Sequence, residues 1–152
     1  MATATRTEHV TLGGLLLATT AIDCFDWADL LSRPEKRGTD IVIPGAPGVL
    51  ARGREQSALR AVLQVRIDGR WVHDTGASTG ATVAAWREGA YDAWALLTAK
   101  DLDTTQTLLL TYPGGPTASA DCQVLEVAMS RQPAPYLWFA TVDVLLPDGG
   151  LI

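Results

Sequence analysis

Residues 37–54 read RGTDIVIPGAPGVLARGR, and this stretch decides how the first half of the chain is organised. An apolar triplet, Ile-Val-Ile, precedes the run Pro-Gly-Ala-Pro-Gly. Pro44 and Pro47 lack the N–H that an interior strand needs, while Gly45 and Gly48 allow positive φ angles. The chain therefore has to turn here, and the stretch predicts a hairpin with a proline-rich turn.

The clearest strand pattern follows at residues 59–67. Apolar residues recur there at every second position, which predicts a half-buried strand. Asp68 and Gly69 come directly afterwards. This pair predicts a tight hairpin turn into Trp71 and Val72.

The period of the apolar residues changes to steps of three and four over residues 82–100, which predicts an amphipathic helix. Thr82, which begins this range, or Thr79 is the expected N-cap. Gly89 should weaken the helix by roughly 1 kcal/mol relative to alanine. Trp86 and Trp94 are expected to anchor the helix in the core.

Four other segments predict strands. Residues 9–22 predict one or two strands broken at a Gly-Gly pair, and residues 107–112, 120–129 and 137–146 predict three more between loops rich in Gly and Pro. Residues 122–129 are apolar on both faces. They predict a strand buried on both sides, by the chain's own helix or by a neighbouring subunit.

Length and composition fit one compact domain, and the predicted elements make it mainly β with one packed α-helix. The chain has 152 residues, of which 47% are hydrophobic and 19% charged, which is enough for one substantial core. We expect a single domain over residues 1–152, with residues 1–8 as a flexible N-terminal arm. The net charge of −5 disfavours general binding to nucleic-acid backbones.

The cysteines and the N-terminus predict a soluble protein made in a cytoplasm. Cys24 and Cys122 are too few for a disulfide framework, so we expect free thiols in a reducing compartment. The N-terminus has no signal-peptide pattern, and no apolar run is long enough to span a membrane.

Residues 74–78, DTGAS, imitate the active-site signature of retroviral-type aspartic proteases. In such enzymes each of two subunits supplies one aspartate, and the pair shares a proton and activates water. A protease made from this chain would use Asp74. The signature has apolar strand residues directly before the aspartate, whereas His73 stands there. We therefore expect no catalytic residues, and the Asp74 protease is the alternative from another functional class.

Other chemical signatures are weaker still. The pattern G-x-S-x-G occurs around Ser78, but both histidines precede this serine, in the reverse of the order that such hydrolases need. The sequence has no metal-ligand spacing, P-loop or dinucleotide fingerprint, so we expect neither a metal nor a cofactor. A small-molecule-binding β-barrel is a third option, for which no ligand residues stand out.

The chain resembles the N-terminal ring-forming domain of the distal tail proteins of long-tailed (siphovirus-type) bacteriophages. The resemblance rests on the Leu-rich opening around the Gly-Gly pair and on the run from Arg-Gly-Thr-Asp through Pro-Gly to Arg-Gly-Arg-Glu, at residues 37–55. The long alternating strand that ends in Asp-Gly, a helix and further strands then follow in order. Likeness of individual residues is confined to residues 37–69. Many family members carry an added carbohydrate-binding-like domain, which we do not expect in this chain.

The resemblance implies a β-sandwich or split barrel in a structural virion protein without enzymatic activity. Copies of the chain would form a hexameric ring at the distal end of the tail, assembled in the host cytoplasm. The ring would join the tail-tube protein to the tail hub or minor tail proteins, pass DNA through its lumen, and not insert into membranes. A tail-tube or tail-terminator protein of the same architecture is the nearest alternative. The residues expected at the subunit interface are Arg37, Asp40, Pro44, Gly48, Arg52 and Arg54.

Overall fold

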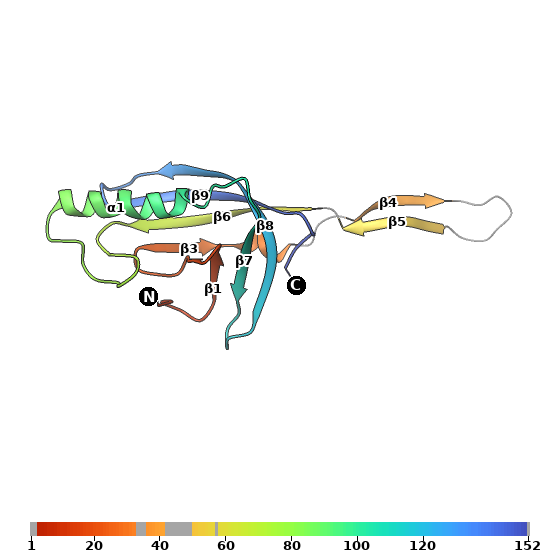
Figure 1. Cartoon of the computed structure of the whole chain (residues 1–152), viewed down its shortest axis with the longest axis horizontal. Coiled ribbons are helices and arrows are strands. Elements are labelled where there is room, and N and C mark those ends of the chain that lie inside the picture. The colour runs from red at the N-terminus through yellow and green to blue at the C-terminus, as the bar shows by residue number, and fades with distance from the viewer. Residues whose placement is uncertain (1–2, 33–35, 42–49, 57, 152) are drawn as a thin grey trace.

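One antiparallel sheet of seven strands curls around the hydrophobic core of the protein (Figure 1). The computed structural model describes residues 3–32, 36–41, 50–56 and 58–151. The order across the sheet is β2-β1-β7-β8-β9-β6-β3. Its strands are β1 (His9–Leu12), β2 (Leu15–Leu16), β3 (Ile22–Asp26), β6 (Leu59–Asp68), β7 (Gln106–Thr111), β8 (Thr117–Arg131) and β9 (Leu137–Leu146).

Three further features complete the described part of the chain. Strands β4 (Lys36–Ile41) and β5 (Leu50–Gln56) form a separate two-stranded sheet. Helix α1 (Val83–Thr98) runs alongside β6 and β9, and a short 3-10 helix, η1 (Ala28–Leu31), follows β3 (Figure 1). The expectation of a mainly β fold with one packed helix is therefore confirmed.

The two ends of the seven-stranded sheet come together through backbone hydrogen bonds. The chain turns between β1 and β2 at two glycines, of which Gly13 has a φ of 55°. Just beyond β2, Ala18 forms an isolated bridge with Asp23. The N–H of Cys24 donates to the carbonyl of Leu17 at 2.7 Å. These contacts bring the sheet close to a barrel, so of the two expected forms it is the split barrel that the chain adopts.

Strands β6 and β9 form the centre of the sheet and pair along their whole lengths. Alternate residues of each strand are buried, as their period-2 patterns predicted. On the outer face, Arg60 donates to the carboxylate of Asp143. The inward-facing residues are Leu59, Ala61, Leu63, Val65 and Ile67 of β6, and Trp138, Ala140, Val142, Val144 and Leu146 of β9.

Helix α1 begins after Thr82, whose side chain accepts a hydrogen bond from the N–H of Ala85, so the predicted N-cap is confirmed. The buried side of the helix consists mostly of small residues. The two tryptophans are only half-buried: Trp86 packs edge-on against Tyr136, and Trp94 lies at the margin of the core. Their predicted role as core anchors is therefore wrong for Trp86 and only partly right for Trp94. The buried residues are Gly89, Ala90, Ala93 and Leu97.

Asp68 and Gly69 do not form the predicted hairpin. β6 pairs with β3 and β9, and the chain after Gly69 runs through a loop to α1. The loop backbone and the helix touch at two glycines. A Cβ on Gly89 would lie 2.2 Å from the carbonyl oxygen of Gly69, and a Cβ on Gly69 would lie 2.1 Å from that of Trp86. Only glycine permits this close approach.

The described part of the N-terminal segment, residues 3–8, lies against the sheet. The N–H of Thr5 donates to the carbonyl of Ala18 at 2.8 Å. Arg6 forms an ion pair with Asp23 and lies over the ring of Trp27. The mobility predicted for this segment stays a prediction. No helix among the described residues is long and apolar enough to cross a membrane.

Candidate assembly interface

The hairpin of β4 and β5 projects from the body of the molecule as an arm (Figure 1). Its strands pair with each other in antiparallel register, from Lys36 opposite Gln56 to Ile41 opposite Leu50. Neither strand pairs with any other described strand. The two strands of the predicted hairpin are therefore confirmed, while its proline-rich turn lies outside the described residues. Because an isolated two-stranded hairpin is marginally stable at best in water, this arm gains from a partner surface.

Four of the six residues predicted at the interface lie on this arm. Pairing places Arg37 opposite Glu55 and Thr39 opposite Arg52, with a register shift between the two pairs. The structure thus brings the basic residues of both strands onto one projecting element, while their contacts with another subunit stay a prediction. Arg37 and Asp40 belong to β4, Arg52 and Arg54 belong to β5, and Pro44 and Gly48 lie outside the described residues.

The arm and the remainder of the chain carry opposite charge. The segment Lys36–Gln56 contains four basic and two acidic residues, a net charge of +2. Because the whole chain carries −5, the residues outside the arm carry −7. Complementary charge of this kind directs the docking of one surface on another.

Strand β8 presents a sheet edge without a partner among the described strands. It pairs with β7 only over residues 117–122 and with β9 only over residues 123–131. On the second half, Leu125 is 40% exposed and the residues from Val127 to Met129 are half-buried. The predicted burial of this strand on both faces is therefore not achieved by the chain's own helix. Burial by a neighbouring subunit stays a prediction.

A cleft lies between α1 and the loop that precedes it, and we call it the α1 cleft. Its volume is about 110 Å³. Trp71, Val72 and Leu96, all more than a third exposed, supply apolar wall. Asp74 and Asp92 add two carboxylates to the lining. The complete lining is Trp71, Val72, His73, Asp74, Thr79, Gly89, Asp92, Ala93 and Leu96.

The sequence did not predict the α1 cleft, because its residues come from a loop and from a helix whose contact is not local. A signal was present nonetheless. Gly89 and Ala93 are small residues one turn apart on α1, and such spacing allows another backbone to approach a helix closely.

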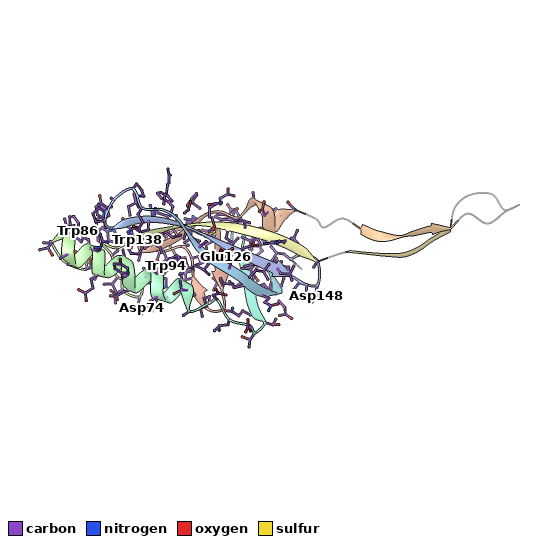
Figure 2. All side chains as sticks on the ribbon, turned by 90° about the horizontal axis from the view of Figure 1, so that it is seen from above. Asp74, Trp86, Trp94, Glu126, Trp138 and Asp148 are labelled. Carbon is purple, nitrogen blue, oxygen red and sulfur yellow. The ribbon has the colours of Figure 1, made fainter. Side chains whose placement is uncertain are left out.

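Asp74 lies on an exposed turn beside α1, in the half of the body away from the arm (Figure 2). The turn is closed by the N–H of Gly76, which donates to the carbonyl of Val72 at 2.8 Å. No strand leads into Asp74. The strand context of the aspartic-protease signature is therefore missing.

The neighbouring His73 is buried, and its Nδ1 lies 3.0 Å from the hydroxyl of Thr19. Burial lowers the pKa of His73, although the adjacent Asp74 acts in the opposite direction. This histidine therefore favours its neutral form. Ser78, of the G-x-S-x-G pattern, donates instead to the carbonyl of Gly80 at 3.2 Å.

The two cysteines are buried free thiols of low reactivity. Burial raises the pKa of Cys24 to about 12 and that of Cys122 to about 11, so neither is a thiolate near neutral pH. Within the described residues, no group of three or more His, Cys, Asp and Glu side chains is placed to hold a metal ion.

Comparison with known proteins finds a likeness in fold. No protein-family model and no curated protein sequence matches the chain. Among solved structures, it is similar to the Dit (gp 19.1) protein of SPP1, which is described as a paradigm of the hub adsorption apparatus in phages that infect Gram-positive bacteria. The two align with a TM-score of 0.56 and 13% sequence identity, over 94% of this chain. The chain spans about half of that protein, 51% of its length. At this identity the likeness shows a shared fold, that of one half of a phage tail hub protein.

Proposed function

We propose that this chain is a structural protein of a bacteriophage tail tip, in which copies assemble into a hexameric ring between the tail tube and the hub proteins. The observation that carries the proposal is the fold shared with SPP1 Dit over 94% of the chain. The protein would therefore reside in the virion. Its partners would be further copies of itself and the tail proteins on either side.

The arm supports association between copies. It has open strand edges, it is basic, and the rest of the chain is acidic. A contact that joins an arm to a different surface on the next copy is heterologous, and such contacts close into rings when the rotation between copies permits. The unpartnered edge of β8 and its partly exposed apolar residues offer further surface that a neighbour would cover.

The charge of the chain suits a ring around DNA. Tight binding to DNA comes from basic side chains that neutralise phosphates. A ring of acidic subunits lacks this attraction, so DNA passes through without being held. The function requires passage of DNA and no recognition of its sequence.

Size-exclusion chromatography with light scattering, native mass spectrometry and negative-stain electron microscopy of the purified chain test the proposal. We expect closed rings from the full chain. We expect a folded monomer when a flexible Gly-Ser linker replaces Lys36–Gln56, because no described residue of the arm pairs with a strand of the body. A full chain that stays monomeric at tens of micromolar and behaves like the arm-deleted chain refutes the ring.

A tail-tube or tail-terminator protein has the same architecture and remains the alternative within this class. Labelling of phage particles with an antibody against the chain separates the three positions along the tail. The Asp74 protease has little support from the structure, since Asp74 lies in an exposed turn without a preceding strand. A peptidase assay at acid pH, with Asp74→Asn as control, decides it: activity lost in the variant alone would establish a protease.

A further inference from the structure

We propose that the α1 cleft is the site that receives an arginine from the arm of a second copy of this chain. The inference rests on the proposed function, in which arms join copies. It adds the location of the acceptor site and the chemistry of the contact.

The lining of the α1 cleft suits an arginine side chain. The indole of Trp71 and the side chain of Leu96 are exposed enough to pack against an aliphatic stem and a planar guanidinium. Asp74 and Asp92 line the cleft, and a carboxylate is the group that accepts paired hydrogen bonds from a guanidinium. A volume of about 110 Å³ admits one long side chain and excludes a strand or a helix.

The described residues of the body leave the carboxylates of the cleft unpaired. Among the described residues, Asp74 and Asp92 form no ion pair and accept no side-chain hydrogen bond, so a cation from outside would complete the site. Arg70, close by in sequence, is already bound to Asp68 at 2.8 Å. Arg87, on α1, lies over the ring of Tyr91.

The position of the cleft requires that the arginine come from another copy. Figures 1 and 2 show α1 and Asp74 in the half of the body away from the β4–β5 arm, which projects from the opposite end. An arm cannot reach the cleft of its own chain. The arm has a net charge of +2 and the rest of the chain −7, so the arm of one copy is attracted to the body of the next.

The test uses two variants of the chain, the arm-deleted chain and the cleft variant, that each lack one half of the contact. In the first, a Gly-Ser linker replaces Lys36–Gln56, so that the cleft remains without an arm. In the second, Asp74→Asn and Asp92→Asn remove the two charges of the cleft and leave the arm intact. The matched control for charge is Asp101→Asn with Asp103→Asn, two exposed carboxylates outside the cleft.

Assembly is followed by native mass spectrometry and by light scattering at several concentrations. We expect the wild-type chain and the control variant to assemble. The arm-deleted chain alone and the cleft variant alone should each stay monomeric. A mixture of the two variants should give a one-to-one heterodimer, because the free arm of one fits the free cleft of the other. Loss of a charge-assisted contact of this kind corresponds to about a tenfold to hundredfold weaker association.

The outcomes separate this inference from the proposed function. If the cleft variant assembles like the wild type while the arm-deleted chain does not, the arm docks elsewhere, for example on the edge of β8, and the inference is wrong. If the control variant also fails to assemble, net charge and not the cleft governs association, and the inference is wrong. A wild-type chain that stays monomeric overturns both.

Substitutions on the arm then identify the arginine. Arg37→Gln, Arg52→Gln and Arg54→Gln are introduced one at a time. One of them should weaken association by the same factor as the cleft variant. The effects of that substitution and of the cleft variant should not add when combined, because both remove one contact. Three weak and additive effects would overturn a single arginine anchor.

Discussion

Replacement of Gly89 by alanine tests the packing of α1 against the loop. Helix propensity alone predicts that alanine stabilises the protein by about 1 kcal/mol. The structure predicts the opposite, because the new Cβ would lie 2.2 Å from the carbonyl oxygen of Gly69 and 2.9 Å from Cγ2 of Thr79. Backbone atoms cannot rotate away as a side chain does, and relief of such overpacking costs about 3 kcal/mol. The expected net loss is about 2 kcal/mol in the free energy of unfolding.

Urea unfolding followed by tryptophan fluorescence and circular dichroism measures this loss, at one protein concentration because association adds to apparent stability. Ala95→Gly is the matched control, since Ala95 is an exposed position within the same helix. It should cost about 1 kcal/mol through propensity alone. If Gly89→Ala instead raises the free energy of unfolding by about 1 kcal/mol, the close approach of helix and loop is refuted.

Three further predictions concern single residues. Thr82→Ala removes the N-cap of α1 and should lower the free energy of unfolding by about 1 kcal/mol, as measured by urea titration. The pKa of His73 is lower in the folded state than its ordinary value of 6.5, so its contribution to stability is complete above pH 6.5 and lost as the pH falls below it. Denaturation curves between pH 8 and 5 should therefore lose less stability in His73→Asn than in the wild type, and equal losses in the two would contradict the lowered pKa of His73. Cys24 and Cys122, with pKa values raised to about 12 and about 11, should resist a thiol reagent at pH 8 until urea unfolds the chain; fast labelling of the native protein would contradict their burial.

Period was enough to predict the long central strands and the helix, but not β3 or the short helix η1. The alternation over residues 59–67 and 137–146 became β6 and β9, and the steps of three and four became α1 with its N-cap at Thr82. These patterns are local, because a strand or helix with one buried face repeats that face along its own sequence. The β-sheet order is not local, and the misplaced hairpin at Asp68 and Gly69 shows this. The partners of β6 turned out to be β3 and β9, neither of which is adjacent in sequence.

The candidate site was predictable in part for the same reason. The turn chemistry of residues 37–54 predicted the hairpin and placed basic residues on it. A hairpin packs on the body only if the rest of the chain offers it a surface to bury. The residues of the hairpin itself do not show whether such a surface exists. The α1 cleft depends on two glycines, Gly69 and Gly89, whose contact joins separate segments. From the sequence alone, Gly89 was predicted only to weaken the helix relative to alanine.

The same contact links the stability of the fold to the proposed assembly. The approach of α1 to the loop is what places Asp92 of the helix and Asp74 of the loop around one cleft. Gly89→Ala should therefore weaken association as well as folding, because it separates the two walls. The pairing of β4 with β5 is marginally stable in isolation, so part of the contact free energy is spent on holding these two strands together. The affinity of each single contact should accordingly be modest. Stable association should depend on closure of the ring, because every subunit of a closed ring both inserts its arm into a neighbour and receives the arm of another.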